Sequence, residues 1–163
     1  MPISTYLKGL RAHVGHDHVL LPVVSVSILD ERGCVLLGKD AEMGLWTLPG
    51  GAIWPGEQPA DAAVRECFEE TGFFVAIESL IGVFGGPEFL VKYRNGDVSF
   101  FTTIAFQGTI IDQDRQPSIG QMSELGYFSQ SDCDVLTLSD PTRLILKSTF
   151  ARGEQPIFQS PNG

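Results

Sequence analysis

The sequence predicts an α+β fold, since strand-like and helix-like segments both occur along its 163 residues. Runs rich in Val, Leu, Ile and Phe are typical of buried strands, and they cover residues 20–29, 74–84 and 98–106. Residues 59–71 show helical periodicity, and Ser139-Asp140-Pro141 is expected to open a second helix with a cap and a first-turn proline. A chain of this length is expected to form a single domain with its own core.

Turn residues divide the first half of the chain. Asp30-Glu31-Arg32-Gly33 is expected to turn the first strand, and residues 34–37 should return beside it as a hairpin partner. A short strand over residues 46–48 then leads into Leu48-Pro49-Gly50-Gly51, a glycine turn that exposes backbone groups. This turn precedes the helix predicted at residues 59–71, so we expect exposed backbone groups beside that helix.

The second half of the chain contains a hairpin signal and a late strand. Residues 89–93 and 98–106 are expected to pair around Asn95-Gly96, which favours a two-residue turn. Residues 108–121 are polar and are interpreted as a loop of the kind that often carries binding residues. A further strand is expected over residues 124–128.

The two ends of the chain are interpreted as additions to this domain. Residues 1–18 are polar and mixed, and they are expected to form an N-terminal extension that caps the domain or contacts a second copy. His13, His16 and His18 lie close together there, but their spacing matches no zinc-binding pattern and no cysteine is nearby. Residues 155–163 are expected to form a loose tail.

Composition and charge argue against some partners. The formal net charge of −9 disfavours long nucleic acid, because such binding depends on clustered Lys and Arg. A small phosphorylated substrate is compatible with this charge, since a bound metal ion would supply positive charge locally. No stretch approaches the roughly 18 apolar residues of a membrane helix, and the N-terminus lacks an apolar signal core. The odd number of cysteines, three, favours a reducing, cytoplasmic location.

The helix predicted at residues 59–71 carries three carboxylates on one face. At about 100 degrees per residue, Glu66, Glu69 and Glu70 share one sector, and the apolar residues fall on the other side. At about 5 Å, two carboxylates repel by roughly 1 kcal/mol in water and roughly 3 at an effective dielectric near 20. The cluster therefore needs a counter-charge, and Mg²⁺ or Mn²⁺ suits carboxylate and phosphate oxygens. The ordinary alternative is an acidic face covered by water.

A fixed spacing connects this helix to the glycine turn. The residues that define the spacing are Gly51, Glu57, Arg65, Glu66, Glu69, Glu70 and Gly72, followed by the apolar Phe73. The pattern resembles the Nudix box, the signature of the Nudix hydrolase superfamily. One departure is Cys67, where the family usually has an aliphatic residue and where a buried thiol behaves as a small hydrophobe. The resemblance implies the Nudix fold, a mixed β-sheet sandwiched between α-helices.

The resemblance also implies a metal site. Glu66, Glu69 and Glu70 are similar to the metal-binding carboxylates of the family, and the Gly50 carbonyl is a further expected ligand. The cofactor expected from the resemblance is Mg²⁺ or Mn²⁺.

Other residues of the pattern are expected to support this site. Arg65 should orient the acidic cluster and pair with Glu57, because a planar guanidinium can bind two carboxylates and keeps its charge. Gly51 and Gly72 are expected to provide the turn and the helix end.

The identity of the general base stays open between two residues. Glu66 is one candidate, because it belongs to the box itself. Some members use a glutamate far along the chain, and Glu124 is the best placed one here. Its ordinary interpretation is a surface acid at the start of a strand.

The implied reaction is hydrolysis of a diphosphate linkage in a nucleoside diphosphate joined to another moiety. ADP-ribose-like compounds, nucleoside triphosphates and dinucleoside polyphosphates are all candidate substrates. One alternative is a catalytically silent sensor of a nucleotide or nucleotide sugar, although silent members usually have damaged boxes. Another is an isopentenyl diphosphate isomerase, which would need a catalytic cysteine and a histidine-assisted metal site. Dimers are frequent among relatives, so a homodimer is one expectation for the assembly.

Overall fold

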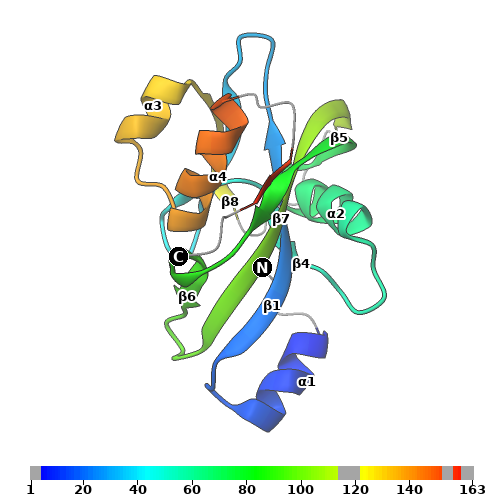
Figure 1. Ribbon diagram of the computed structural model, residues 1–163, viewed down its shortest axis with the longest axis vertical. Helices are drawn as coiled ribbons and strands as arrows, with labels where there is room; N and C mark the ends of the chain where they lie inside the picture. Colours follow the sequence, from blue (N-terminus) through cyan, green and yellow to red (C-terminus); the bar gives the residue numbers. More distant parts are fainter. Residues whose placement is uncertain (1–4, 114–121, 152–155, 159–163) are drawn as a thin grey trace.

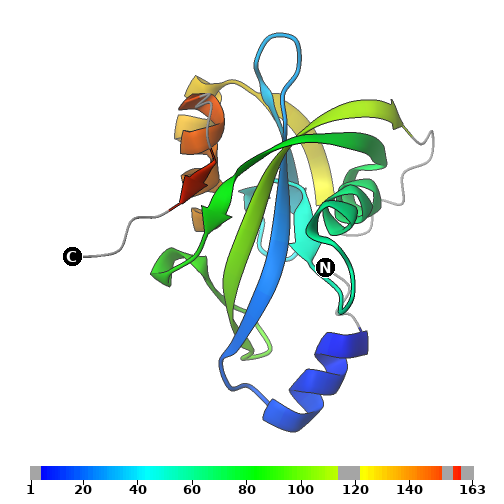
Figure 2. The same cartoon turned by 45° about the vertical axis from the view of Figure 1, so that its right-hand side comes forward.

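The structure is a computed structural model that describes residues 5–113, 122–151 and 156–158 of the chain. The predicted α+β class is confirmed, because β-sheets form the centre and helices cover them on both sides (Figure 1, Figure 2). The larger sheet has six strands, in the order β4 (Gly50–Ala52), β1 (Val19–Ile28), β7 (Val98–Gln113), β5 (Phe73–Phe84) and β9 (Ile157–Phe158), with β6 (Leu90–Lys92) paired to β7.

A smaller sheet and several helices complete the described part of the fold. Figure 1 shows α2 on one side of the sheets, α3 and α4 on the other, and α1 at one end of β1. The smaller sheet has three strands, β3 (Trp46–Thr47), β2 (Val35–Asp40) and β8 (Met122–Phe128). The helices are α1 (Thr5–Val14), α2 (Pro59–Thr71), α3 (Gln130–Val135) and α4 (Asp140–Ala151), with a short 3-10 helix η1 (Pro87–Phe89).

Strand β1 packs different helices against its two faces, because successive side chains of a strand point to opposite sides. Val24 and Val26 belong to a buried cluster that includes Cys67 of α2. Leu21 and Val23 belong to another cluster, against which residues of α1 pack. Strand β1 therefore fixes the position of α2, the helix that carries the acidic residues.

The hairpin expected between residues 20–29 and 34–37 is largely absent. The turn itself closes, because the Asp30 N–H donates to the Cys34 carbonyl at 2.9 Å, and Leu29 and Val35 form a single bridge. Beyond this bridge, β2 leaves β1 and pairs with β3 and β8 in the smaller sheet. The reason is that both edges of β1 already have partners, β7 along its whole length and β4 over part of it.

The strand predicted at residues 98–106 is longer than expected. Strand β7 continues to Gln113 and pairs with β5 along this extension, so the first part of the predicted loop at 108–121 is strand. Residues 114–121 lie outside the described residues. The hairpin between β6 and β7 is present, but its loop spans residues 93–97 and is closed by a hydrogen bond from the Tyr93 N–H to the Asp97 carbonyl at 2.9 Å.

Both ends of the chain contain regular structure that was not expected. The N-terminal segment forms α1, whose Leu7, Leu10 and Val14 pack against the start of β1. At the other end, Ile157–Phe158 form β9 and pair with β5, so this part of the expected loose tail is a strand. In the described part of the chain, no helix is long and apolar enough to cross a membrane.

Candidate active site

Helix α2 has the predicted bounds, so its acidic residues keep the spacing inferred from the sequence. Pro59 occupies the first turn, where the absence of an N–H costs nothing. Gly72 ends the helix in the left-handed conformation with a φ of 74°, and its N–H donates to the Phe68 carbonyl at 2.8 Å. Ala63 and Cys67 are buried on the sheet side, which fixes the rotation of the helix.

The glycine turn leaves no room for side chains next to this helix. A Cβ at Gly51 would overlap the carboxylate of Glu66, and a Cβ at Gly50 would overlap the Val24 carbonyl of β1. The Gly50 N–H donates to Glu70 Oε2 at 2.9 Å. Two glycines in sequence therefore allow β4 to lie between β1 and the glutamates of α2.

Two of the three predicted metal ligands are buried. Glu66 is 2% exposed and Glu70 is 8% exposed. Glu66 Oε1 accepts a hydrogen bond from Arg65 Nη1 at 2.8 Å, whereas Glu66 Oε2 is buried with no hydrogen-bond partner. Removal from water raises the pKa of Glu70 to about 8 and also raises the pKa of Glu66. Burial of both carboxylates is costly unless a cation neutralises them.

Arg65 connects α2 to the residues around it. Its Nε and Nη2 donate to the two oxygens of Glu57 at 2.8 and 2.9 Å, so the pairing expected from the resemblance is present. Nη2 also donates to the Ala52 carbonyl at 3.0 Å, and Nη1 lies 3.5 Å from Glu69 Oε2. The hydrogen bonds to Glu57 and Glu66 raise the pKa of Arg65, which therefore stays charged.

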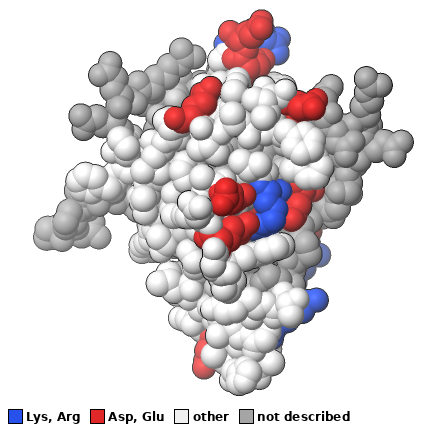
Figure 3. Space-filling view, turned by 90° about the vertical axis from the view of Figure 1, so that its right-hand side faces the viewer, with Lys and Arg blue, Asp and Glu red and all other residues white. Residues whose placement is uncertain are grey.

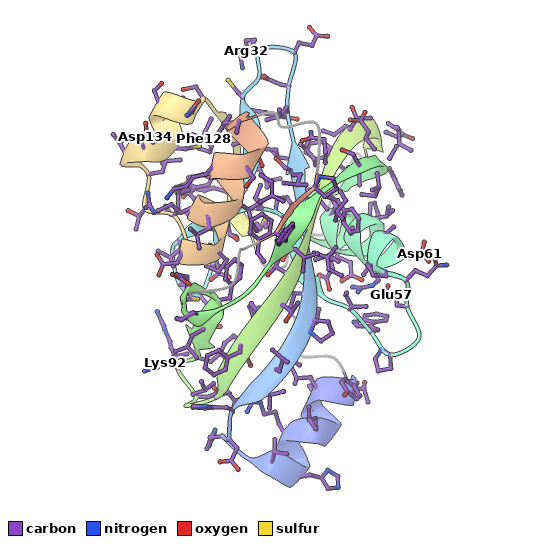
Figure 4. The ribbon with its side chains drawn as sticks, viewed as in Figure 1. Arg32, Glu57, Asp61, Lys92, Phe128 and Asp134 are labelled. Carbon is purple, nitrogen blue, oxygen red and sulfur yellow. The ribbon has the colours of Figure 1, made fainter. Side chains whose placement is uncertain are left out.

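Charged side chains of both signs meet on the face that carries α2. Figure 3 shows basic atoms flanked by acidic atoms on this face, and Figure 4 shows Asp61 directed outward near the start of α2, whereas the side chain of Glu57 is bound to Arg65. The Glu69 side chain is 36% exposed, twice the 18% of Arg65, to which it is joined. The acidic cluster thus has a buried part and a part open to solvent.

The donor atoms of this cluster fit a hard divalent cation. Glu57, Glu66 and Glu69 share the single guanidinium of Arg65, which leaves an excess of negative charge. Over the described residues, no three His, Cys, Asp or Glu side chains are already grouped as a metal would require. Glu66 Oε2, which is buried and accepts no hydrogen bond, is an oxygen that could bind a cation.

The structure does not place Glu124 in the acidic cluster. Glu124 lies on β8 opposite Lys39 of β2, forms an ion pair with it at 2.9 Å, and has a side chain that is 56% exposed. Its role as general base stays a prediction. The next residue of β2, Asp40, adds negative charge that helps to raise the pKa of Glu70. No motif contains Asp40, so nothing in the sequence singles it out.

The three histidines near the N-terminus have different partners. His13 Nδ1 lies 2.8 Å from the Gly9 carbonyl, within α1, and His16 Nδ1 lies 2.7 Å from Asp97 Oδ1. The His18 ring contacts Phe100 edge-on, with 5.4 Å between the ring centroids. All three histidines are exposed, and each has a different partner.

Trp54 is a site residue that the sequence reasoning did not single out. The guanidinium carbon of Arg65 lies 3.9 Å from the centroid of the Trp54 ring. The backbone N–H of Trp54 donates to Glu57 Oε2 at 3.0 Å. Trp54 stands between Gly51 and Glu57, where the box accepts any residue. The signal that could have identified Trp54 is the presence of a large aromatic residue in the turn before α2.

The fold and the site together define a class of protein, an α+β domain in which a glycine turn and an acidic helix gather carboxylates suited to a divalent cation. The profile of the NUDIX domain matches residues 19–137. The chain therefore belongs to the Nudix family.

Relatives and solved structures agree with this assignment. A protein of Bacillus subtilis (strain 168), named as a proposed 8-oxo-dGTP diphosphatase, is 47% identical over 64 residues, which are 39% of this chain and 43% of the relative. The RNA pyrophosphohydrolase of Rickettsia conorii is 35% identical over 83 residues, covering 47% of this chain and 52% of the relative. The chain thus spans about half of the length of these relatives.

The fold likeness extends over more of the chain. The crystal structure of an ADP-ribose pyrophosphatase from Streptococcus suis superposes with a TM-score of 0.65 and covers 84% of this chain and 96% of that protein. The two sequences are 22% identical, so this likeness shows the fold alone.

Proposed function

We propose that this chain hydrolyses a diphosphate linkage in a nucleoside diphosphate joined to another group, and that the reaction depends on Mg²⁺ or Mn²⁺. The observation that carries the proposal is the buried pair Glu66 and Glu70 beside the Gly50-Gly51 turn. Carboxylates buried without a neutralising cation would destabilise an ordinary core, whereas a metal site that binds phosphate requires them. Relatives named as a diphosphatase and a pyrophosphohydrolase support the same reaction class.

The residues that would hold the metal are Glu66, Glu69, Glu70 and the carbonyl of Gly50. When bound, the metal neutralises phosphate charge and lowers the pKa of the attacking water. The Gly50 N–H keeps Glu70 at the turn through its 2.9 Å hydrogen bond. Glu69 is the most exposed of the three carboxylates, so it can meet a cation that arrives from solvent.

Arg65 acts as a positioning residue in this proposal. Both oxygens of Glu57 hold its guanidinium, and its Nη1 faces Glu66 and Glu69. Such a fork fixes the orientation of carboxylates without contact with the substrate. Gly51 and Gly72 support the same geometry, because one leaves space for Glu66 and the other ends the helix.

The general base is Glu66 or Glu124. Glu66 already lies in the acidic cluster beside Arg65, whereas Glu124 would first have to leave its ion pair with Lys39. These observations favour Glu66 as the base.

The substrate is best identified with a panel. It should contain ADP-ribose, nucleoside triphosphates including oxidised ones, and dinucleoside polyphosphates, each incubated with Mg²⁺ and with EDTA. Because one relative is named an RNA pyrophosphohydrolase, triphosphorylated RNA belongs in the panel, although the net charge of −9 argues against long RNA. Hydrolysis that requires Mg²⁺, with phosphate, pyrophosphate or nucleoside monophosphate as product, supports the proposal. Nucleotide binding without hydrolysis of any compound would contradict it and indicate a silent sensor.

A further inference from the structure

An apolar groove of about 230 Å³ lies between α1 and the turn that precedes α2. Tyr6 of α1, Leu20 of β1 and the Trp54-Pro55 turn form its walls, and none of the residues that line it is charged. Pockets that bind whole ligands usually measure about 300–1,000 Å³. A groove of this size therefore suits one part of a larger ligand.

Large apolar side chains are left open to solvent around this groove. Leu20 is 69% exposed, Tyr6 54% and Trp54 44%. A single exposed apolar residue is common on protein surfaces, but a contiguous group marks a surface that a ligand or partner covers. The two aromatic rings offer flat faces, which suit a planar ring system.

The groove adjoins Arg65, the residue that contacts Glu66 and Glu69 of the acidic cluster. Ala52 lines the groove, and its carbonyl accepts a hydrogen bond from Arg65 Nη2 at 3.0 Å. Trp54 also lines it, and the same guanidinium lies 3.9 Å from the centre of the Trp54 ring. A ligand that spans both places would have its charged part near α2 and its uncharged part in the groove.

Trp54 is held in place before any ligand arrives. Arg65 lies over the indole ring, and the backbone N–H of Trp54 donates to Glu57 Oε2 at 3.0 Å. A rigid aromatic ring loses little conformational entropy when another ring stacks on it. This preorganisation favours a planar aromatic ligand over a flexible aliphatic one.

We propose that this groove binds the base of the nucleotide substrate while the diphosphate lies at α2. The inference rests on the proposed function, because it assigns the second half of the same substrate. It adds the place where the base binds and the residues, Tyr6, Leu20 and Trp54, that contact it.

The first test measures kcat and KM of the full chain with Mg²⁺ and the best nucleotide of the panel. Leu20→Gln and Tyr6→Ala should each raise KM about tenfold and leave kcat within about twofold, because base stacking contributes to ground-state and transition-state binding alike. Val135→Gln is the matched control, because Val135 is 84% exposed at the end of α3, on a part of the molecule away from α1 (Figure 1). Unchanged KM values in both groove variants would overturn the inference.

The second test does not require turnover. In a Trp46→Phe variant, Trp54 is the single tryptophan, and its fluorescence can be titrated with AMP, GMP or UMP in EDTA. We expect quenching by the nucleotides, none by ribose 5-phosphate, and weaker quenching when Leu20→Gln is added. Equal responses to AMP and ribose 5-phosphate would overturn the base assignment. Base-dependent quenching in a chain that hydrolyses no compound of the panel would contradict the proposed function but would still support binding of a base in the groove.

A second copy of the chain is the competing occupant of the groove, and size-exclusion chromatography with light scattering tests it. We expect Leu20→Gln to leave the molar mass unchanged. A dimer that becomes a monomer in this variant, with KM unaffected, would assign the groove to subunit contact and overturn the inference.

Discussion

Gly51 shows at the scale of one residue how closely the site is packed. A Cβ at this position would overlap the Glu66 carboxylate, whereas a Cβ at Gly9 of α1 would have no atom within 4 Å. Gly51→Ala should therefore displace Glu66 and lower kcat by orders of magnitude, with a loss of about 1–3 kcal/mol in the free energy of unfolding. Activity assays and urea unfolding measure the two effects. Gly9→Ala is the control and should leave both unchanged or slightly improve stability. Normal turnover in Gly51→Ala would contradict this account.

The proposed metal ligands of α2 and an acid elsewhere on the same helix should differ sharply when they are neutralised. Glu69→Gln and Glu70→Gln should each reduce kcat by orders of magnitude while the fold stays intact, because each removes a proposed metal ligand. Asp61→Asn is the matched control, since Asp61 is an exposed acid in the first turn of the same helix. Circular dichroism checks the fold, and near-normal activity in both glutamine variants would remove the metal assignment.

Glu70 should make the stability of the metal-free protein depend on pH. Burial raises its pKa from 4.5 to about 8, so between these values the folded protein holds a proton that the unfolded chain has lost. The free energy of unfolding should therefore fall as pH rises through this window, by up to a few kcal/mol at about 1.4 kcal/mol per pKa unit.

Urea unfolding in EDTA at about pH 5 and about pH 8 measures this loss. Glu70→Gln should remove most of it and be more stable than the unsubstituted chain at the higher pH, because no charge is then buried. Addition of Mg²⁺ should restore stability at the higher pH in the unsubstituted chain alone. A metal-free protein that becomes more stable towards about pH 8 would show that Glu70 ionises without cost.

At the scale of elements, α1 is attached to the β6–β7 hairpin by polar contacts. Arg11 Nη2 donates to the Val98 carbonyl at 2.8 Å and to Ser99 Oγ at 3.0 Å, and Arg11 Nε lies 3.6 Å from Asp97. Arg11→Ala should loosen α1, lower the free energy of unfolding by about 1–3 kcal/mol and speed amide exchange in this helix. Lys8→Ala, on the same helix, is the control. An unchanged rate of amide exchange in Arg11→Ala would show that the apolar contacts of Leu10 and Val14 are enough to hold α1 in place.

The sequence predicted the elements whose signals are local. Helix α2 has the expected bounds because the proline that begins it, the apolar spacing along it and the glycine that follows it are all local signals. The β1–β2 hairpin was predicted wrongly because β1 pairs with β4 and β7, which both follow β2 in the chain, and no residue of the turn indicates this. Helix α1 was not predicted because the burial of its apolar side chains depends on packing against β1, which the segment itself does not indicate.

The same distinction applies to the site. Gly51, Glu57, Arg65 and the α2 glutamates lie within one short segment, and the structure brings them together as their spacing indicated. Asp40, by contrast, reaches the surroundings of Glu70 from another strand. The apolar groove forms where α1, β1 and the turn at Trp54 meet, so no single segment of the sequence could have predicted it.

At the scale of the whole molecule, the central pairing joins distant parts of the chain. Strand β1 pairs in parallel with β7, from Val19 beside Ser99 to Ile28 beside Gly108. During synthesis, β1 therefore cannot pair with β7 until well over half of the polypeptide has left the ribosome. In refolding experiments, closure of so long a loop should place the main phase between milliseconds and seconds, and microsecond relaxation would contradict this.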